Sequence, residues 1–180
     1  TPFFDLLKII ARKFLKKRLP KPGRSLSRTK SFNNPVVSRI WLWIAILDLI
    51  IYWGVYVRIL SVFGIWVICD RYLEDTRLDF KLNFPKENFE KFFLWRLLQL
   101  IVPNPNASFL LWVPVDVSLV RSAQKNEPFP DDEETLFWRL DSYLDEEKFP
   151  SEKYMKLDGT LPINDMSQLI IQECKNRGVI

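Results

Sequence analysis

A chain of 180 residues with 48% hydrophobic residues can bury the core of one domain, and this composition excludes disorder over most of its length. Histidine is absent, which excludes histidine triads, histidine metal sites and histidine acid–base chemistry. The net charge of +4 conceals a strong asymmetry along the chain. Residues 1–30 contain ten Lys/Arg and one acid, whereas residues 126–152 contain ten acids and two bases. This asymmetry argues against an even nucleic-acid-binding face.

The N-terminal third predicts two helices separated by a basic loop. Apolar residues recur at helical spacing over 2–19, and the basic stretch 20–34 is rich in helix breakers, so we expect a mobile loop there. The stretch 39–60 is the most apolar, and Asp48 is its only charge between Trp41 and Val57. It could be a core helix or a membrane span, but a charge at mid-membrane costs about 2.5–3.5 kcal/mol. The core helix is therefore favoured.

Two short apolar runs, 65–69 and 107–113, predict strands that are buried on both faces of a parallel sheet. An edge-like strand is expected at 153–157. The helical patterns between and after these runs cover 83–102, 117–124, 133–147 and about 160–177. Strands that alternate with helices predict an α/β fold with a mostly parallel sheet, in a single domain over 1–180.

The triplet Asp70-Arg71-Tyr72 directly follows the predicted strand at 65–69. Ligands of open α/β sheets bind beyond the carboxyl ends of the strands, so this triplet is a candidate site. Arg71 could make bidentate contacts to a phosphate, and Asp70 could hold a metal-bound water. The alternative is a surface salt bridge or an arginine that anchors the loop.

Three further positions are candidates. Arg121 lies one turn into the helix after the second predicted strand, where its guanidinium could stack on a base or simply be solvated. The segment 125–132 is placed where a lid could close, although it is acidic and could be a plain surface loop. Asp48 needs a partner if it is buried, either a substrate or one of three arginines, Arg39, Arg58 and Arg71.

In this order, the motifs resemble the thymidylate kinase family. The run WVICDRY at 66–72 is similar to that family's strand followed by Asp-Arg-Tyr, and VPVDVSLVR at 113–121 is similar to its next strand and the start of its lid helix. The segment LDGTLPI at 157–163 resembles its last strand and helix. The resemblance implies a cytoplasmic nucleoside monophosphate kinase with a three-layer P-loop kinase fold, in which Mg²⁺ and ATP serve transfer of the γ-phosphoryl group to a nucleotide such as dTMP.

The resemblance also implies roles for individual residues. Arg71 would bind phosphates, Asp70 would support Mg²⁺ through water, and Tyr72 with Asp48 would shape the acceptor site. On the donor side, Arg121 would lie against adenine and Lys125 would offer the cation of the lid.

Three departures from the family limit this reading. The pattern G-x-x-x-x-G-K-[ST] does not occur, so we expect the first strand and the P-loop to be missing from this chain, and the chain alone to be inactive. Leucine follows Asp48 where the family has arginine, and the lid lacks arginine. The rival reading is a non-catalytic degenerate kinase fold, or a membrane-tethered interaction module that uses 39–60. Nucleotides are the expected partners, nucleic acid is not, and homodimer formation stays open.

Overall fold

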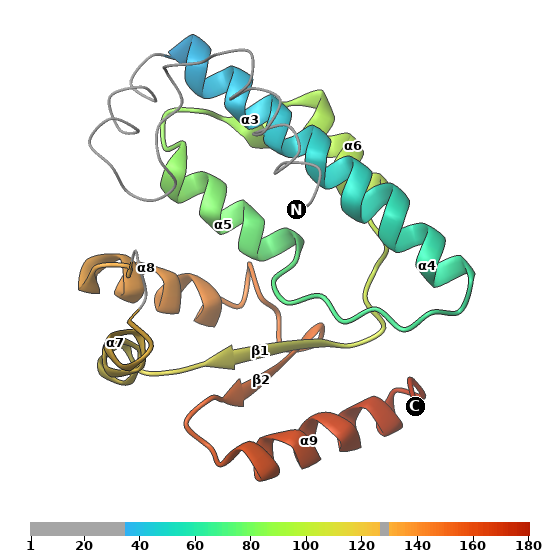
Figure 1. The fold of residues 1–180 in the computed structure, drawn as a ribbon, viewed down its shortest axis with the longest axis vertical. Helices are drawn as coiled ribbons and strands as arrows, with labels where there is room; N and C mark the ends of the chain where they lie inside the picture. The colour runs from blue at the N-terminus through green and yellow to red at the C-terminus, as the bar shows by residue number, and fades with distance from the viewer. Residues whose placement is uncertain (1–34, 127–129) are drawn as a thin grey trace. The chain divides into compact units, whose positions relative to one another are not determined.

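A computed structural model of the protein describes residues 35–126 and 130–180. The helix predicted at 2–19 and the loop predicted at 20–34 lie outside the described residues, as do three residues of the predicted lid. The chain divides into two compact units with the boundary after Pro103 (Figure 1).

The first unit begins with one long helix, Pro35–Val62, which confirms the helix predicted at 39–60. It consists of α3 (Pro35–Leu49), a π-helical stretch η1 (Ile50–Val57) and α4 (Arg58–Val62). Proline suits the first turn of a helix because it has no N–H to leave unpaired. The helix ends just before Gly64, whose φ of +71° is the left-handed conformation that stops helices.

The rest of the first unit contains α5 (Leu73–Asn83), a 3-10 turn η2 (Phe89–Lys91) and α6 (Phe93–Ile101). The single helix predicted at 83–102 is therefore wrong in its first half. The proline at 85 forces the preceding Phe84 out of the helical region, to φ −130° and ψ 56°, and α5 ends there. Phe92 is extended, with φ −70° and ψ 136°, and α6 starts anew after it.

The core of the first unit lies between the long helix and the aromatic residues that follow it. α3 packs on α6, and Trp95 and Phe89 meet edge to face with ring centroids 4.9 Å apart. A Cβ on Gly54 would lie 2.5 Å from Ile101 Cδ1, so glycine allows η1 and α6 to approach closely. The fully buried large side chains of this core are Leu42, Ile46, Phe89, Trp95 and Leu98.

The second unit is a small parallel sheet with three helices. The order is β1 (Ser108–Trp112), α7 (Val115–Gln124), α8 (Glu133–Leu144), β2 (Tyr154–Asp158) and α9 (Ile163–Asn176). β1 and β2 pair in parallel, from Ser108 opposite Tyr154 to Trp112 opposite Asp158. These elements confirm the strands predicted at 107–113 and 153–157 and the three helices, with shifted ends. The expected burial of the first strand on both faces is wrong, because Leu111 is 49% exposed and β1 has one neighbouring strand among the described residues. The described chain is thus a mixed α/β structure, mostly helical, with two parallel strands.

The buried strand predicted at 65–69 is wrong. The segment follows α4 without strand structure, and Ile65, Trp66 and Ile68 are 51%, 64% and 96% exposed. A strand forms only where a neighbouring strand pairs with its backbone. Among the described residues, β1 and β2 pair only with each other, and neither pairs with 65–69.

Candidate functional site

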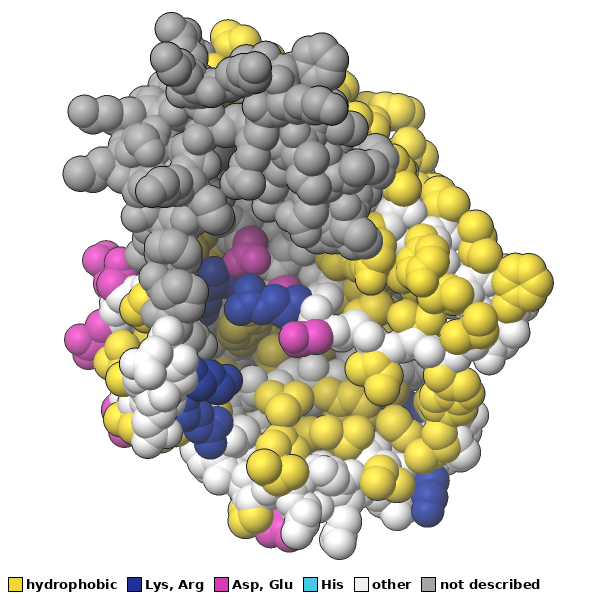
Figure 2. All heavy atoms as spheres, viewed as in Figure 1, with side chains coloured by type: hydrophobic (Ala, Val, Ile, Leu, Met, Phe, Trp, Pro, Cys, Tyr) yellow, Lys and Arg dark blue, Asp and Glu magenta, His cyan; other side chains and the backbone are white. Residues whose placement is uncertain are grey.

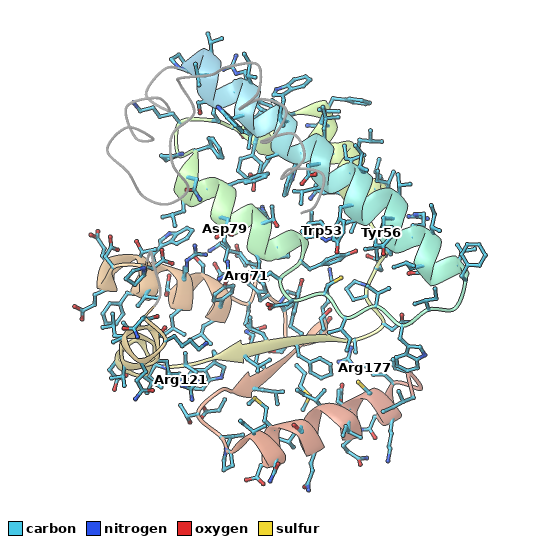
Figure 3. All side chains as sticks on the ribbon, in the orientation of Figure 1. Trp53, Tyr56, Arg71, Asp79, Arg121 and Arg177 are labelled. Carbon is cyan, nitrogen blue, oxygen red and sulfur yellow. The ribbon has the colours of Figure 1, made fainter. Side chains whose placement is uncertain are left out.

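At the carboxyl ends of β1 and β2, residues that are far apart in the sequence of the second unit lie close together. α7 follows β1 and carries Arg121, labelled in Figure 3. Its Nη2 donates a hydrogen bond of 3.0 Å to the carbonyl oxygen of Gly159, which directly follows β2. Arg121 is otherwise exposed. The two parallel strands therefore place an arginine and a backbone turn at the sheet edge where α/β proteins bind ligands.

The turn after β2 is held by Asp158 and Thr160. The Oδ1 atom of Asp158 accepts hydrogen bonds from the Thr160 backbone N–H, at 2.8 Å, and from its hydroxyl, at 2.7 Å. These bonds, with a smaller contribution from the charge of Arg121, lower the pKa of Asp158. The carboxylate therefore stays ionised at neutral pH and fixes the turn.

Gly159 lies in the tightest part of this site. Its N–H donates to the Trp112 carbonyl at 2.7 Å, which joins the end of β2 to the end of β1. A Cβ at this position would lie 2.7 Å from Val113 Cγ1 and 3.1 Å from the Trp112 oxygen. Gly159 and Thr160 were not predicted as site residues, although an Asp-Gly-Thr run after an apolar stretch is a signal that could have indicated them.

Lys125 and the predicted lid follow directly from α7. Lys125 caps the C-terminal end of the helix, donates its backbone N–H to the Arg121 carbonyl at 3.0 Å, and is exposed. The far end of the predicted lid is joined to α8 by an ion pair of 2.9 Å between Asp131 and Arg139. Residues 127–129 lie outside the described part, so the structure leaves the lid hypothesis as a prediction.

The predicted site at Asp70-Arg71-Tyr72 lies in the first unit, between the exposed segment 65–69 and α5. Arg71 has φ +63°, a left-handed conformation that is uncommon for a residue other than glycine. Its Nη1 contacts Asp79 Oδ2 at 3.4 Å, and the two side chains are 59% and 32% exposed (Figure 3). Such an exposed ion pair is weak. Arg71 therefore forms the surface ion pair that was the alternative prediction. More than half of its side chain is exposed, and the exposed Asp70 precedes it in the sequence.

Tyr72 anchors this turn to the core of the first unit. Its hydroxyl donates to the Pro103 carbonyl at 2.8 Å, and its ring lies 4.8 Å from that of Trp53. Burial, as the largest cause, raises the pKa of Tyr72 to about 12. The hydroxyl therefore remains protonated, and a donor, over the physiological range.

Asp48 is buried on α3, with 4% of the residue exposed. The three arginines named as its candidate partners each contact another group. Arg39 pairs with Glu87 at 3.2 Å, Arg58 Nε donates to the Ile101 carbonyl at 3.0 Å, and Arg71 contacts Asp79. These contacts do not test whether one of the three arginines also interacts with Asp48, which stays a prediction.

The predicted residues thus fall into two sets. Asp48, Asp70, Arg71 and Tyr72 belong to the first unit, and Arg121 and Lys125 to the second. Over residues 35–126 and 130–180, there is no group of three or more Cys, Asp or Glu side chains that could hold a metal ion. A single exposed carboxylate such as Asp70 fits a Mg²⁺ ion that keeps most of its water and takes further ligands from phosphates.

Comparison with known proteins adds no family. No family model, no curated protein and no solved structure matches the chain. Assignment of a function therefore depends on the motifs of the sequence and on the geometry described above.

Proposed function

We propose that this chain supplies part of the nucleotide-binding surface of a phosphotransferase of the nucleoside monophosphate kinase type, with Arg121 lying against the adenine of ATP. The observation that carries the proposal is the meeting of Arg121 and Gly159 at the carboxyl ends of two parallel strands, 3.0 Å apart. Nucleotides bind at this edge in α/β folds that are otherwise unrelated.

The geometry suits a planar base. The hydrogen bond to Gly159 holds one edge of the guanidinium, and its flat face remains available because Arg121 is exposed. A guanidinium stacks on aromatic rings through cation–π attraction and planar contact. The ionised Asp158 is held by Thr160, so it fixes the position of the carbonyl that orients the arginine.

The resemblance to nucleotide kinases assigns the phosphate and acceptor roles to residues of the first unit. ATP would supply the γ-phosphoryl group, and Mg²⁺ would neutralise part of its charge. Arg71 would contact phosphate oxygens, Asp70 would accept hydrogen bonds from water around the ion, and Tyr72 would border the acceptor. The chain contains no glycine-rich phosphate loop, so we expect weak ATP binding and little or no transfer to dTMP.

Calorimetric titration of the chain with ATP tests the donor site. We expect Arg121→Ala to weaken binding about three- to thirtyfold, the range expected for one stacking arginine. Arg177→Ala is the matched control, because Arg177 is also in the second unit but bonds the Glu173 carboxylate on α9. Equal affinity of the Arg121 variant and the unmodified chain would contradict the proposed site.

A phosphoryl-transfer assay with ATP and dTMP tests the expectation that this chain has little or no kinase activity. Normal turnover by this chain would show that the phosphate loop is dispensable and would refute the expectation of inactivity. A folded chain that binds no ATP at all would instead favour the non-catalytic reading of the fold.

A further inference from the structure

The outward face of the helix Pro35–Val62 carries a continuous line of large apolar side chains. Six of them recur every three or four residues and are each between 42% and 55% exposed, namely Ile40, Trp43, Leu47, Ile51, Val55 and Ile59. We call these six residues the outer stripe. Figure 2 shows hydrophobic side chains gathered over the η1 and α4 end of this helix. A monomeric soluble protein rarely exposes an apolar surface of this length without a partner for it.

The opposite face of the same helix is already occupied. Leu42, Ile46 and Trp53 are buried in the core of the first unit. Arg58 donates to the Ile101 carbonyl of α6, and Gly54 lies against the Ile101 side chain. The helix is long and apolar enough to cross a bilayer, with a mean hydropathy of 1.9 over its most apolar 18 residues. If the helix crossed the bilayer, the core of the first unit would have to enter the lipid or unfold. Contact with the bilayer along the outer stripe leaves that core intact.

The charge of the neighbouring sequence favours a lipid surface over a second copy of the chain. Residues 1–30 precede the helix and contain ten Lys/Arg against one acid. A parallel dimer formed through the outer stripe would bring two such segments together, with mutual repulsion. An anionic bilayer surface would attract them, and stable attachment without a membrane span takes two such signals, apolar insertion and basic residues. Exposed Trp43 and Tyr56, at 42% and 51%, are the side-chain types enriched at the membrane–water interface.

We propose that the outer stripe docks on the surface of an anionic lipid bilayer, with the helix Pro35–Val62 lying in the plane of the membrane and residues 1–30 supplying the attraction to lipid headgroups. The inner face of the helix stays in the protein core. This interaction is independent of the proposed contact between Arg121 and adenine, which uses the second unit.

Flotation of the full chain with vesicles tests the proposal. We expect roughly tenfold or more greater binding to phosphatidylcholine vesicles that contain phosphatidylserine than to vesicles of phosphatidylcholine alone, with release at high salt and by alkaline carbonate. Val55→Glu should lower binding at least about tenfold, because it places a charge at the lipid contact. The matched control is Val120→Glu, at a valine of α7 that is 57% exposed, and it should bind like the unmodified chain.

A conservative variant keeps the test valid if Val55→Glu perturbs folding. Val55→Phe preserves an apolar side chain and should bind at least as well as the unmodified chain, with an unchanged circular dichroism spectrum. Four outcomes would overturn the proposal: no binding to either vesicle, equal binding of the two vesicle types, full binding by Val55→Glu, or retention after carbonate extraction, which would indicate a membrane span. A dimer in light scattering that Val55→Glu dissociates, without vesicle binding, would identify a second copy as the occupant.

Discussion

Replacing Gly159 by alanine should destabilise the second unit. The added methyl carbon would lie 2.7 Å from Val113 Cγ1 and 3.1 Å from the Trp112 carbonyl oxygen, whereas relaxed carbon–carbon contacts are about 3.5–4.0 Å. Overpacking of this kind costs about 1–3 kcal/mol. Alanine also restricts the unfolded chain, which returns about 0.4–1 kcal/mol. We therefore expect a net loss of about 1–2 kcal/mol in the free energy of unfolding.

Urea denaturation followed by far-ultraviolet circular dichroism measures this loss. With a slope of about 1–2 kcal/mol per molar urea for a unit of this size, the midpoint should fall by roughly 1 M. Val113→Ala removes the carbon that the new methyl meets, so the double variant should be less destabilised than the sum of the two single changes by about 0.5 kcal/mol or more. Unchanged stability of Gly159→Ala, or strict additivity with Val113→Ala, would refute the steric reasoning.

Three further substitutions test a hydrogen bond and a core side chain within the first unit and a helix cap within the second unit. Tyr72→Phe removes the hydrogen bond to Pro103 and should cost about 1 kcal/mol of unfolding free energy. The folded-state pKa of Tyr72, about 12, is raised above its ordinary value, so this contribution is fully present below about pH 10 and lost as pH rises toward 12. The stability gap to the phenylalanine variant should close over that window, and a constant gap would contradict the assignment. Trp95→Ala empties a site that is 1% exposed and should cost about 3–5 kcal/mol by thermal or urea unfolding. Asp132→Ala removes the cap that accepts the Thr135 N–H at 2.9 Å and should cost about 1 kcal/mol, whereas Asp132→Asn should restore most of it.

Local patterns of the sequence predicted most elements but not the partners of those elements. The long helix could be predicted because apolar residues fill nearly every position of 39–60. Which residues form its inner and outer faces could not be predicted from residue type. Leu42 and Leu47 are both leucine, yet Leu42 is fully buried and Leu47 is 43% exposed. The segment 65–69 has the composition of a strand, but strand formation depends on a neighbour that composition does not reveal. The break at Phe84 could have been predicted from the following proline.

The candidate sites show the same division. The sequence pattern predicted that Arg121 lies on a helix that follows a strand, and the structure places it in the last turn of α7. Its contact with Gly159 could not be predicted, because the two residues are 38 positions apart and meet only through the parallel register of β1 and β2. Tyr72 was predicted to shape a ligand site, whereas its hydroxyl bonds a carbonyl 31 positions away. The Arg71 backbone, with its positive φ, is a conformational property that the residue type gives no reason to expect.

The π-helical stretch at 50–57 has a consequence for the shape of the helix that contains it. In an α-helix, a step of four residues turns about 40° past a full rotation, so side chains spaced by four drift steadily around the axis. The wider turn of a π-helix holds more residues, and the same step falls short of a full rotation there. The positions 47, 51, 55 and 59 span this stretch. The forward rotation of the side chains in the α-helical part is therefore offset by the backward rotation in the π-helical part. The side chains of the outer stripe can therefore form a straight line along the exposed face of the helix, while Trp53 and Val57 remain buried on its inner face.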